Sequence, residues 1–335
     1  MAGDPADLQE HLLRSSLETL TPREGKMLTT SYDDSTPLPP GAETDLADSH
    51  PRLLALRQAY AKAAPVLNVH TQWDDTRMRA RLNRRYFRGD SVYVWDLREL
   101  PRATTLKYFI FAQYLRGIDR HGLLDKLGED GAFGCWTFEF LGVGRVSRDL
   151  LDSVNEILFL DRHLSILNRP ALRVLDIGAG YGRLAHRMTQ AIAGLKDYCC
   201  VDAIPDSTFL CDYYLRYRGC IPPARVVPLH ELESEVRPGS FDLALNIHSF
   251  SECTRDAVAW WANWLQRLSV PYWLIVPNEP NEFLTTEANG SRYDYRPLIE
   301  AAGYVQAASE PVFNDPAIRN LMRINDHFFL FRLKS

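Results

Sequence analysis

The pattern of hydrophobic and polar positions changes near residue 145 and divides the chain into two parts. In the first part, apolar side chains recur every three or four residues, which is the spacing of amphipathic helices. One series runs through Leu53, Leu56, Tyr60 and Ala63, and a second through Leu106, Phe109, Ile110, Tyr114 and Ile118. A long helix is predicted directly after residue 145, with Ser147 as its N-cap and an apolar stripe through Leu150, Val154 and Ile157.

Three other segments of the first part lack helical spacing. Residues 91–95 are predicted to form a short strand. Residues 131–144 are rich in glycine and aromatic side chains, which predicts a loop packed against another part of the chain. Residues 1–51 are polar and interrupted by prolines, so loose backbone, or backbone ordered by a partner, is expected there.

The second part consists of short apolar runs separated by helix-length segments. The runs cover residues 173–177, 198–201, 224–229, 241–247, 272–276 and 327–333. Because these runs show no polar alternation, they suit parallel strands that helices cover on both faces. Between the fourth and fifth runs, Trp261, Trp264 and Leu265 recur at helical spacing and predict one covering helix. The expected fold class is α/β with an N-terminal, mostly helical region.

Composition narrows the choice of partner and compartment. The chain has 335 residues with 38 Lys and Arg against 43 Asp and Glu, a formal charge of −5, and it lacks a dense basic run. We therefore expect no nucleic-acid partner. The N-terminus does not read as a signal peptide and no apolar stretch is long enough for a membrane span, so a cytoplasmic protein is expected. The six cysteines form no CxxC pair, which favours buried thiols over a metal site.

A glycine-rich turn follows the first strand of the second part. The segment from Asp176 to Arg183 reads D-I-G-A-G-Y-G-R and leads into a helix. Glycines permit close approach of a ligand to the backbone, and the turn is expected to leave N–H groups free at the helix start. Arg183 stands where the dinucleotide form G-x-G-x-x-G has its third small residue, so the fit to a nicotinamide fold is poor. The spacing resembles motif I of the S-adenosylmethionine-dependent methyltransferases.

The neighbouring strand ends supply further candidate cofactor residues. Asp202 follows the second strand, where a carboxylate can accept hydrogen bonds from both ribose hydroxyls; its alternative role is helix capping. Leu229 and His230 end the third strand, where the adenine rests in the family named above. The full candidate set for S-adenosylmethionine is Asp176, Gly178, Ala179, Gly180, Asp202, Ala203, Leu229, His230 and Asn246. In this set, Asp176 is expected to order the glycine turn and the amino-acid end of the cofactor.

His248 and Glu252 are the candidate catalytic residues. They follow the fourth strand, which lies beside the first in a doubly wound sheet, so both are expected near the reactive end of the cofactor. A histidine there can remove the proton of an attacking hydroxyl. Glu252 is either a rival base or the residue that orients His248; the alternatives are a backbone hydrogen bond for the histidine and a solvated acid for the glutamate. The Asn/Asp-Pro-Pro-Tyr signature and a strand-tip acid for magnesium are both missing, so metal-independent transfer to a hydroxyl oxygen is expected.

Three segments in order resemble the sugar O-methyltransferases of the nanchangmycin type, a class I methyltransferase family. They are residues 148–157 (RDLLDSVNEI), 174–182 and 246–252 (NIHSFSE). The resemblance covers roughly residues 145–335 and implies a Rossmann-like seven-stranded sheet whose last strand is antiparallel, with residues 327–333 as its candidate. It also implies a sugar acceptor, a deoxysugar of a glycosylated bacterial natural product such as an antibiotic.

The resulting expectation has three parts along the chain. Residues 1–51 form a polar segment, residues 52–144 a helical lid that shapes substrate specificity, and residues 145–335 the S-adenosylmethionine-binding domain. Glu156, Asn278 and Asn281 are candidate substrate residues, and the oligomeric state, including a homodimer, stays open. The alternatives are methylation of a non-sugar hydroxyl on a polyketide or other small molecule, a catalytically silent binding protein of the same fold, and a nicotinamide oxidoreductase.

Overall fold

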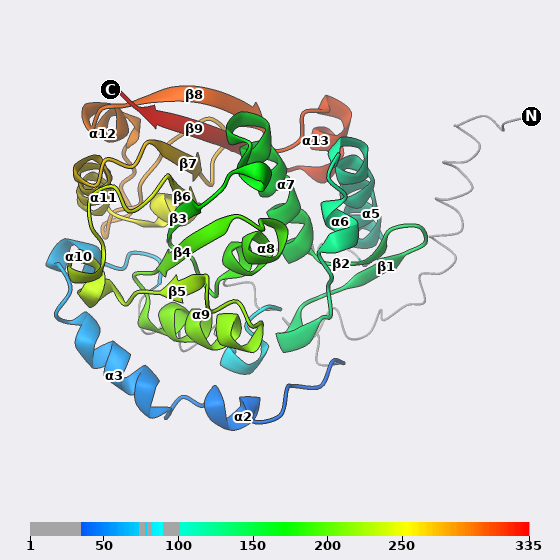
Figure 1. Cartoon of the computed structure of the whole chain (residues 1–335), viewed down its shortest axis with the longest axis horizontal. Helices are drawn as coiled ribbons and strands as arrows, with labels where there is room; N and C mark the ends of the chain where they lie inside the picture. The colour runs from blue at the N-terminus through cyan, green and yellow to red at the C-terminus, as the bar shows by residue number, and fades with distance from the viewer. Residues whose placement is uncertain (1–34, 74–77, 79–81, 90–100, 335) are drawn as a thin grey trace, which may run out of the picture.

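A seven-stranded sheet forms the centre of the molecule. The computed structural model describes residues 35–73, 78, 82–89 and 101–334, so the predicted strand at 91–95 lies outside the described residues. The strands are β3 (Leu172–Ile177), β4 (Leu195–Val201), β5 (Ala224–Val226), β6 (Leu243–Ile247), β7 (Tyr272–Val276), β8 (Tyr304–Pro311) and β9 (His327–Leu333). Their order is β5-β4-β3-β6-β7-β9-β8 (Figure 1). The predicted α/β class is confirmed.

The strand directions create one crevice near the middle of the sheet. β5, β4, β3, β6 and β7 are parallel, and β9 runs antiparallel to both β7 and β8. The final antiparallel strand is therefore confirmed at residues 327–333. Because the chain order reverses between β3 and β6, the residues after these two strands face a common crevice, as expected for a ligand site in an open α/β sheet.

Helices cover both faces of this sheet. They are α7 (Arg148–Leu164), α8 (Arg183–Ala191), α9 (Pro205–Tyr217), α10 (Leu232–Glu235), α11 (Arg255–Arg267), α12 (Arg296–Ala301) and α13 (Pro316–Met322), with short 3-10 turns η4 (Ile166–Asn168), η5 (Leu229–Glu231) and η6 (Ser249–Glu252). Figure 1 shows α10, α11 and α12 on one side and α7 and α8 on the other. As predicted, Ser147 caps α7, since its hydroxyl accepts a hydrogen bond from the Leu150 N–H at 3.1 Å. The tryptophans of α11 that were predicted to cover the sheet are buried.

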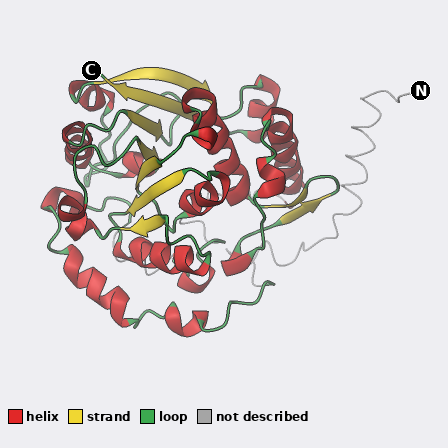
Figure 2. Cartoon of the chain, in the orientation of Figure 1, coloured by secondary structure: helices red, strands yellow, loops and turns green. Residues whose placement is uncertain are grey.

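The N-terminal part is a chain of short elements wrapped around that core. It comprises α2 (Ala42–Asp45), α3 (Pro51–Tyr60), η1 (Pro65–Asn68), η2 (Arg84–Tyr86), α5 (Pro101–Ile118), α6 (Leu123–Lys126), η3 (Ala132–Gly134), β1 (Phe138–Phe140) and β2 (Gly144–Val146). The expected helices α3 and α5 are present. The expectation of a loop at residues 131–144 is wrong in part, because β1 and β2 pair as a small antiparallel hairpin set apart from the main sheet (Figure 2).

Residues 35–51 are more firmly packed than their polar composition predicts. Ala42 and Leu46 are almost completely buried, so loose backbone is not what the structure shows for this stretch. Arg57 and Arg84 both donate to the buried carboxylate of Asp206, at 2.8 and 2.6 Å, and thereby hold the N-terminal part against α9. Residues 35–51 thus bury apolar side chains, and the ion pairs of Arg57 and Arg84, which follow this stretch, fix the N-terminal part to the core domain.

Within the described residues, none of the helices has the length and apolar character needed to cross a membrane.

Candidate functional site

The glycine turn after β3 is shaped by close contact with the loop after β6. Gly178 has φ +77°, and a Cβ at this position would lie 2.2 Å from the Ser249 hydroxyl oxygen, so only glycine fits. The expectation of free N–H groups in the turn is wrong at several positions. The N–H groups of Gly178 and Ala179 donate to the Val201 carbonyl at 2.8 and 3.1 Å, which extends the parallel pairing of β3 with β4 by two residues. Backbone approach, and not an array of free donors, is what this turn offers a ligand.

Asp202 joins the glycine turn to the start of α9. Its carboxylate accepts hydrogen bonds from the N–H of Gly180 at 2.9 Å and of Ile204 at 2.8 Å. The capping alternative therefore describes part of its role, although the N-cap itself is Ile204. Burial raises the pKa of Asp202 to about 7, against the opposing effect of these hydrogen bonds. A carboxylate offers about four acceptor positions, so Asp202 retains capacity for a ligand hydroxyl.

Asp176 is expected to order the glycine turn, but the structure gives this role to Asn246. The Asp176 carboxylate is buried at the end of β3 and accepts a hydrogen bond from the Tyr198 hydroxyl at 2.8 Å; burial raises its pKa to about 6. Asn246 orders the turn instead, since its amide donates to the Ile177 carbonyl at 3.0 Å and its oxygen accepts from the Phe250 N–H at 3.1 Å. Asn246 is fully buried and does not line the cavity, so its expected contact with a cofactor is replaced by a positioning role.

A cavity, the glycine-turn cavity, lies over the carboxyl ends of β3, β4 and β6. Six of the candidate cofactor residues line it together: Asp176, Gly178, Ala179, Gly180, Asp202 and Ala203. Apolar walls come from the N-terminal part and from α9 and α11, namely Leu67, Val69, Met78, Ile204, Ala257 and Trp261. Leu229 and His230 are not among the lining residues. The ring of Tyr60 packs against His230, with ring centroids 5.8 Å apart, and its hydroxyl bonds the Asp202 carbonyl at 3.2 Å.

Residues 71–73 of the N-terminal part form one wall of this cavity and are bound to Glu252. The Trp73 indole N–H donates to a Glu252 carboxylate oxygen at 2.6 Å, and the Thr71 hydroxyl donates to the Glu252 carbonyl at 2.7 Å. Glu252 lines the glycine-turn cavity, but it is not part of the second cavity described below. The expectation that Glu252 acts as the base or orients His248 stays a prediction. Its contacts fix residues 71–73 to the loop after β6.

His248 stands at the junction of two cavities. It follows β6 with φ +66°, an unusual conformation for a residue with a side chain, and its N–H donates to the Val276 carbonyl at 2.7 Å. Burial lowers the pKa of His248 to about 4, with Asp152 and a hydrogen bond to Asn278 acting in the opposite direction. The imidazole is therefore neutral at neutral pH. Its Nδ1 is buried and has no hydrogen-bond partner within the described part of the chain.

The second cavity, the polar chamber, opens on the other side of His248 and has a volume of about 420 Å³. Its lining is Arg148, Asp152, Asn155, Glu156, Arg183, His248, Val276, Asn278, Glu279, Val312, Ile324, Asp326 and Phe328. Glu156 and Asn278, both expected at the substrate, lie here, whereas Asn281 is exposed in the bend after β7 and does not line the chamber. Arg183 lines both cavities and forms a bidentate pair with Glu156 at 2.8 and 2.9 Å.

Sequence reasoning missed most of the chamber wall. Arg148, Asp152 and Asn155 lie three or four residues apart on α7, on the face opposite the apolar stripe. That spacing is readable in the sequence and could have identified a polar helix face. Asp326 gives no such signal, because it reaches the chamber only through the pairing of β9 with β7 and β8.

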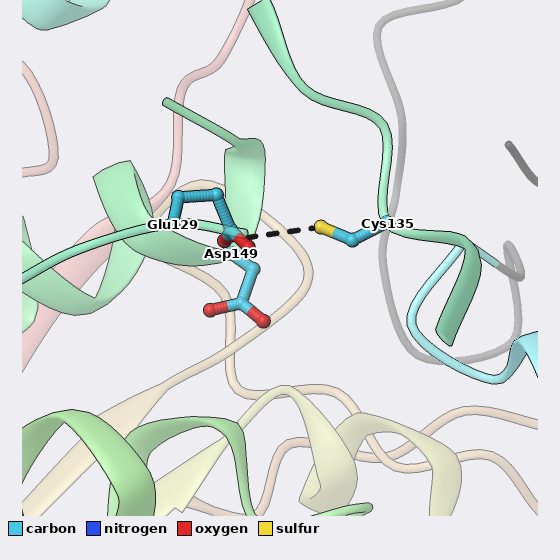
Figure 3. A group of neighbouring side chains, drawn as sticks. All are labelled: Glu129, Cys135 and Asp149. Atoms are coloured by element: carbon cyan, nitrogen blue, oxygen red, sulfur yellow. Dashed lines mark hydrogen bonds between the residues drawn. The ribbon is translucent and has the colours of Figure 1, made fainter. Parts of the chain in front are cut away.

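A buried ion network around Glu129 and Asp149, two of the three side chains drawn in Figure 3, lies next to the glycine turn. Glu129, Cys135 and Asp149 gather there as a metal site would. Instead of a metal ion, two buried guanidinium groups bind the carboxylates of Glu129 and Asp149. Arg88 donates to Glu129 at 2.8 Å and to Asp149 at 2.9 Å, and Arg187 donates to Glu129 at 2.9 Å. The charges of this network are thus compensated within the chain, which favours a structural role over metal binding.

The network also contacts the glycine turn directly. The Tyr181 hydroxyl donates to Asp149 at 2.6 Å, so the residue between Gly180 and Gly182 is fixed by a carboxylate of α7. Burial alone would raise the pKa of Asp149, but Arg88 and Arg187 outweigh it and hold that pKa well below its usual range. Asp149 is therefore ionised and keeps its three partners together.

Comparisons with known proteins give similarity of fold at low identity. No protein-family model and no curated protein matches the chain. Among solved structures, the cyclase SpnF aligns at 13% identity over 56% of this chain and 84% of its own, with a TM-score of 0.42. A methyltransferase from Aquifex aeolicus that depends on S-adenosylmethionine aligns at 12% identity over 66% of this chain and 98% of its own, with a TM-score of 0.40. A second one, from Mesorhizobium loti, aligns at 15% identity over 53% of this chain and 97% of its own, with a TM-score of 0.39.

Proposed function

We propose that the chain is an S-adenosylmethionine-dependent methyltransferase that methylates a hydroxyl oxygen of a small molecule, with a sugar of a glycoside as the acceptor. The observation that carries the proposal is the position of His248. It separates a cavity built on a glycine turn and two acidic strand ends from a chamber lined by polar side chains. A neutral imidazole between a cofactor cavity and a polar chamber is the arrangement that base-assisted group transfer needs.

The glycine-turn cavity suits the cofactor by its chemistry. Asp202 would accept hydrogen bonds from ribose hydroxyls, and the turn from Gly178 to Gly180 allows close backbone approach. Leu67 and Ile204 supply apolar walls of the kind that a flat base requires. When bound, S-adenosylmethionine supplies an electrophilic methyl group on its sulfonium centre.

The residues around the polar chamber would prepare the acceptor. His248 accepts the proton that the hydroxyl loses as it becomes an ether. Its low pKa keeps the imidazole in the base form, and the hydrogen bond to Asn278 orients the ring. The hydrogen bond between Trp73 and Glu252 holds two residues of the cavity wall together. Most of the rate gain then comes from alignment of the reactants, with proton removal as a smaller share.

Titration with S-adenosylhomocysteine and, separately, with NAD tests the cofactor assignment by calorimetry. We expect saturable binding of S-adenosylhomocysteine and none of NAD, because Arg183 is committed to Glu156 and stands where a dinucleotide fold needs a small residue. Binding of NAD alone contradicts the proposal. A screen of glycosides and polyketides with labelled cofactor, read by mass spectrometry, distinguishes a sugar from a non-sugar acceptor. A silent binding protein would bind the cofactor and methylate none of them.

The affinity for S-adenosylhomocysteine should fall as pH decreases through 7. Only the ionised Asp202 can accept hydrogen bonds with both oxygens, and burial raises its pKa to about 7. Protonation below that value should weaken binding about tenfold between pH 8 and pH 6. Calorimetry at several pH values measures this slope. Asp202→Asn should bind weakly and without the slope; a slope that persists in this variant would assign the titration to another group.

A further inference from the structure

The polar chamber holds more carboxyl groups than arginines. Four acidic side chains line it, Asp152, Glu156, Glu279 and Asp326, against the guanidinium groups of Arg148 and Arg183. Each of these arginines already has a partner: Arg148 pairs with Asp152 at 2.5 Å, and Arg183 pairs with Glu156 at 2.8 Å. Glu279 pairs with Arg292, which lies outside the lining. One carboxyl group, that of Asp326, is left over.

Asp326 occupies an environment of like charge. Its carboxyl group forms no hydrogen bond or ion pair with the described residues, although its backbone carbonyl accepts from the Val312 N–H. Burial raises the pKa of Asp326 to about 6; Arg148 opposes this, while Asp152 and Glu279 add to it. An ionised Asp326 thus faces two further carboxylates, each of which already has an arginine partner, Asp152 with Arg148 and Glu279 with Arg292, while the carboxylate of Asp326 has no cation of its own among the described residues. A cation at this end of the chamber would relieve the repulsion.

Unpartnered acceptor atoms point to the same kind of ligand. Asn155 is only 1% exposed, and its amide nitrogen donates to the Val312 carbonyl at 2.8 Å. This bond fixes the orientation of the amide, so the oxygen Oδ1 remains, and it has no partner among the described residues. The carboxylate oxygen Oε2 of Glu279 is likewise buried and has no hydrogen-bond partner among the described residues. Buried acceptors without donors are costly, so the chamber is built for a ligand that donates hydrogen bonds.

We propose that the acceptor carries a protonated amine, which binds between Asp326 and Glu279 while the hydroxyl to be methylated meets His248. The inference rests on the proposed function and specifies its substrate class as an amino sugar or a comparable amino alcohol. A neutral sugar would satisfy Asn155 but would leave the extra carboxylate uncompensated. An acidic acceptor would be repelled. The chemistry therefore selects for a positive charge at one end of the ligand.

The same geometry keeps the amine away from the methyl donor. His248 lines both cavities, whereas Asp326 lines the polar chamber alone. An amine held as an ammonium by a carboxylate also has no lone pair for attack. Oxygen methylation and amine recognition are thus compatible in one chamber.

The test uses the full chain saturated with S-adenosylhomocysteine. The probes are methyl glycosides of 2-amino, 3-amino and 4-amino hexoses, each compared by calorimetry with its hydroxyl counterpart and its N-acetyl derivative. We expect at least one amine to bind about tenfold more tightly than both counterparts, as an ion pair that is partly desolvated allows. If no amine binds more tightly than its hydroxyl counterpart, the proposal is overturned.

Asp326→Asn locates the preference. This variant should bind S-adenosylhomocysteine as the wild type does, and should lose the preference for the amine. Glu233→Gln, which removes an exposed acid of α10 far from the lining, is the matched control and should keep the preference. A preference that survives in Asp326→Asn overturns the assignment of the amine to this carboxylate. Failure to bind S-adenosylhomocysteine at all would instead refute the proposed function, so the two failures are distinguishable.

Discussion

His248→Asn lowers kcat by about 10²–10⁴-fold, the range expected when a positioned general base is lost. His248 has φ +66° and ψ −30°, and asparagine accepts a positive φ better than most residues do, so His248→Asn removes the proton acceptor with little added strain in the loop after β6. Affinity for S-adenosylhomocysteine should stay within about twofold, because the glycine turn and Asp202 are untouched. Turnover is measured with an acceptor found in the glycoside screen, and cofactor binding by calorimetry.

His327→Ala is the control for this experiment. His327 starts β9, and its ring contacts the Asn325 carbonyl at 2.9 Å, outside both cavities. Its loss should leave kcat unchanged. A second variant, His248→Ala, also removes the proton acceptor, but alanine tolerates the positive φ of this position less well than asparagine does. A larger loss of kcat in His248→Ala than in His248→Asn therefore measures backbone strain. Near-normal turnover in His248→Asn would remove His248 from the mechanism, whatever the alanine variant shows.

The glycine turn was predictable because its signals are local. A buried strand, an acid, three glycines and a helix follow one another within 20 residues of sequence. Asp202 could be placed for the same reason, as the first polar residue after the next strand. The hydrogen bonds of the turn could not be predicted, because the Val201 carbonyl that accepts from Gly178 belongs to the neighbouring strand. The sequence pattern therefore predicts where the turn lies, but it does not predict which groups accept hydrogen bonds from the N–H groups of the turn.

Glu252 shows why roles are harder to predict than positions. Its place after the fourth strand is as expected, but its partner Trp73 lies 179 residues earlier in the chain. No spacing rule connects a residue of the lid to one at a strand end. Asn246 is a similar case: an amide at a strand end reads as a ligand contact, and the structure uses it to tie β6 to the glycine turn.

The missed strand β8 has a physical explanation. Tyr304–Pro311 lies at the edge of the sheet and is half exposed, so it lacks the continuous apolar run by which the other strands were identified. Its pairing with β9 also brings Val312 and Asp326 to the polar chamber. The acceptor side of the site was therefore less predictable than the cofactor side, because it is assembled from strand pairing at the far end of the chain.

Asp149→Asn is expected to lower the free energy of unfolding by about 3–5 kcal/mol, the usual cost of removing one partner from a buried ion pair. Arg88 and Arg187 would then share only the carboxylates of Glu129 and, for Arg88, of Asp130 at 3.5 Å. Urea denaturation followed by circular dichroism measures the change. Asp125→Asn is the matched control, because its pair with Arg116 is exposed and should contribute about 0–1 kcal/mol.

The double variant Asp149→Asn/Arg187→Met distinguishes a charge network from simple packing. If the cost of Asp149→Asn arises from an uncompensated guanidinium, removing Arg187 as well should restore part of the stability, so the two changes are not additive. Additive losses would instead mean that both side chains matter only for the space they fill. Because the Tyr181 hydroxyl donates to Asp149, the single variant should also weaken binding of S-adenosylhomocysteine, which links the stability of this network to the cofactor cavity.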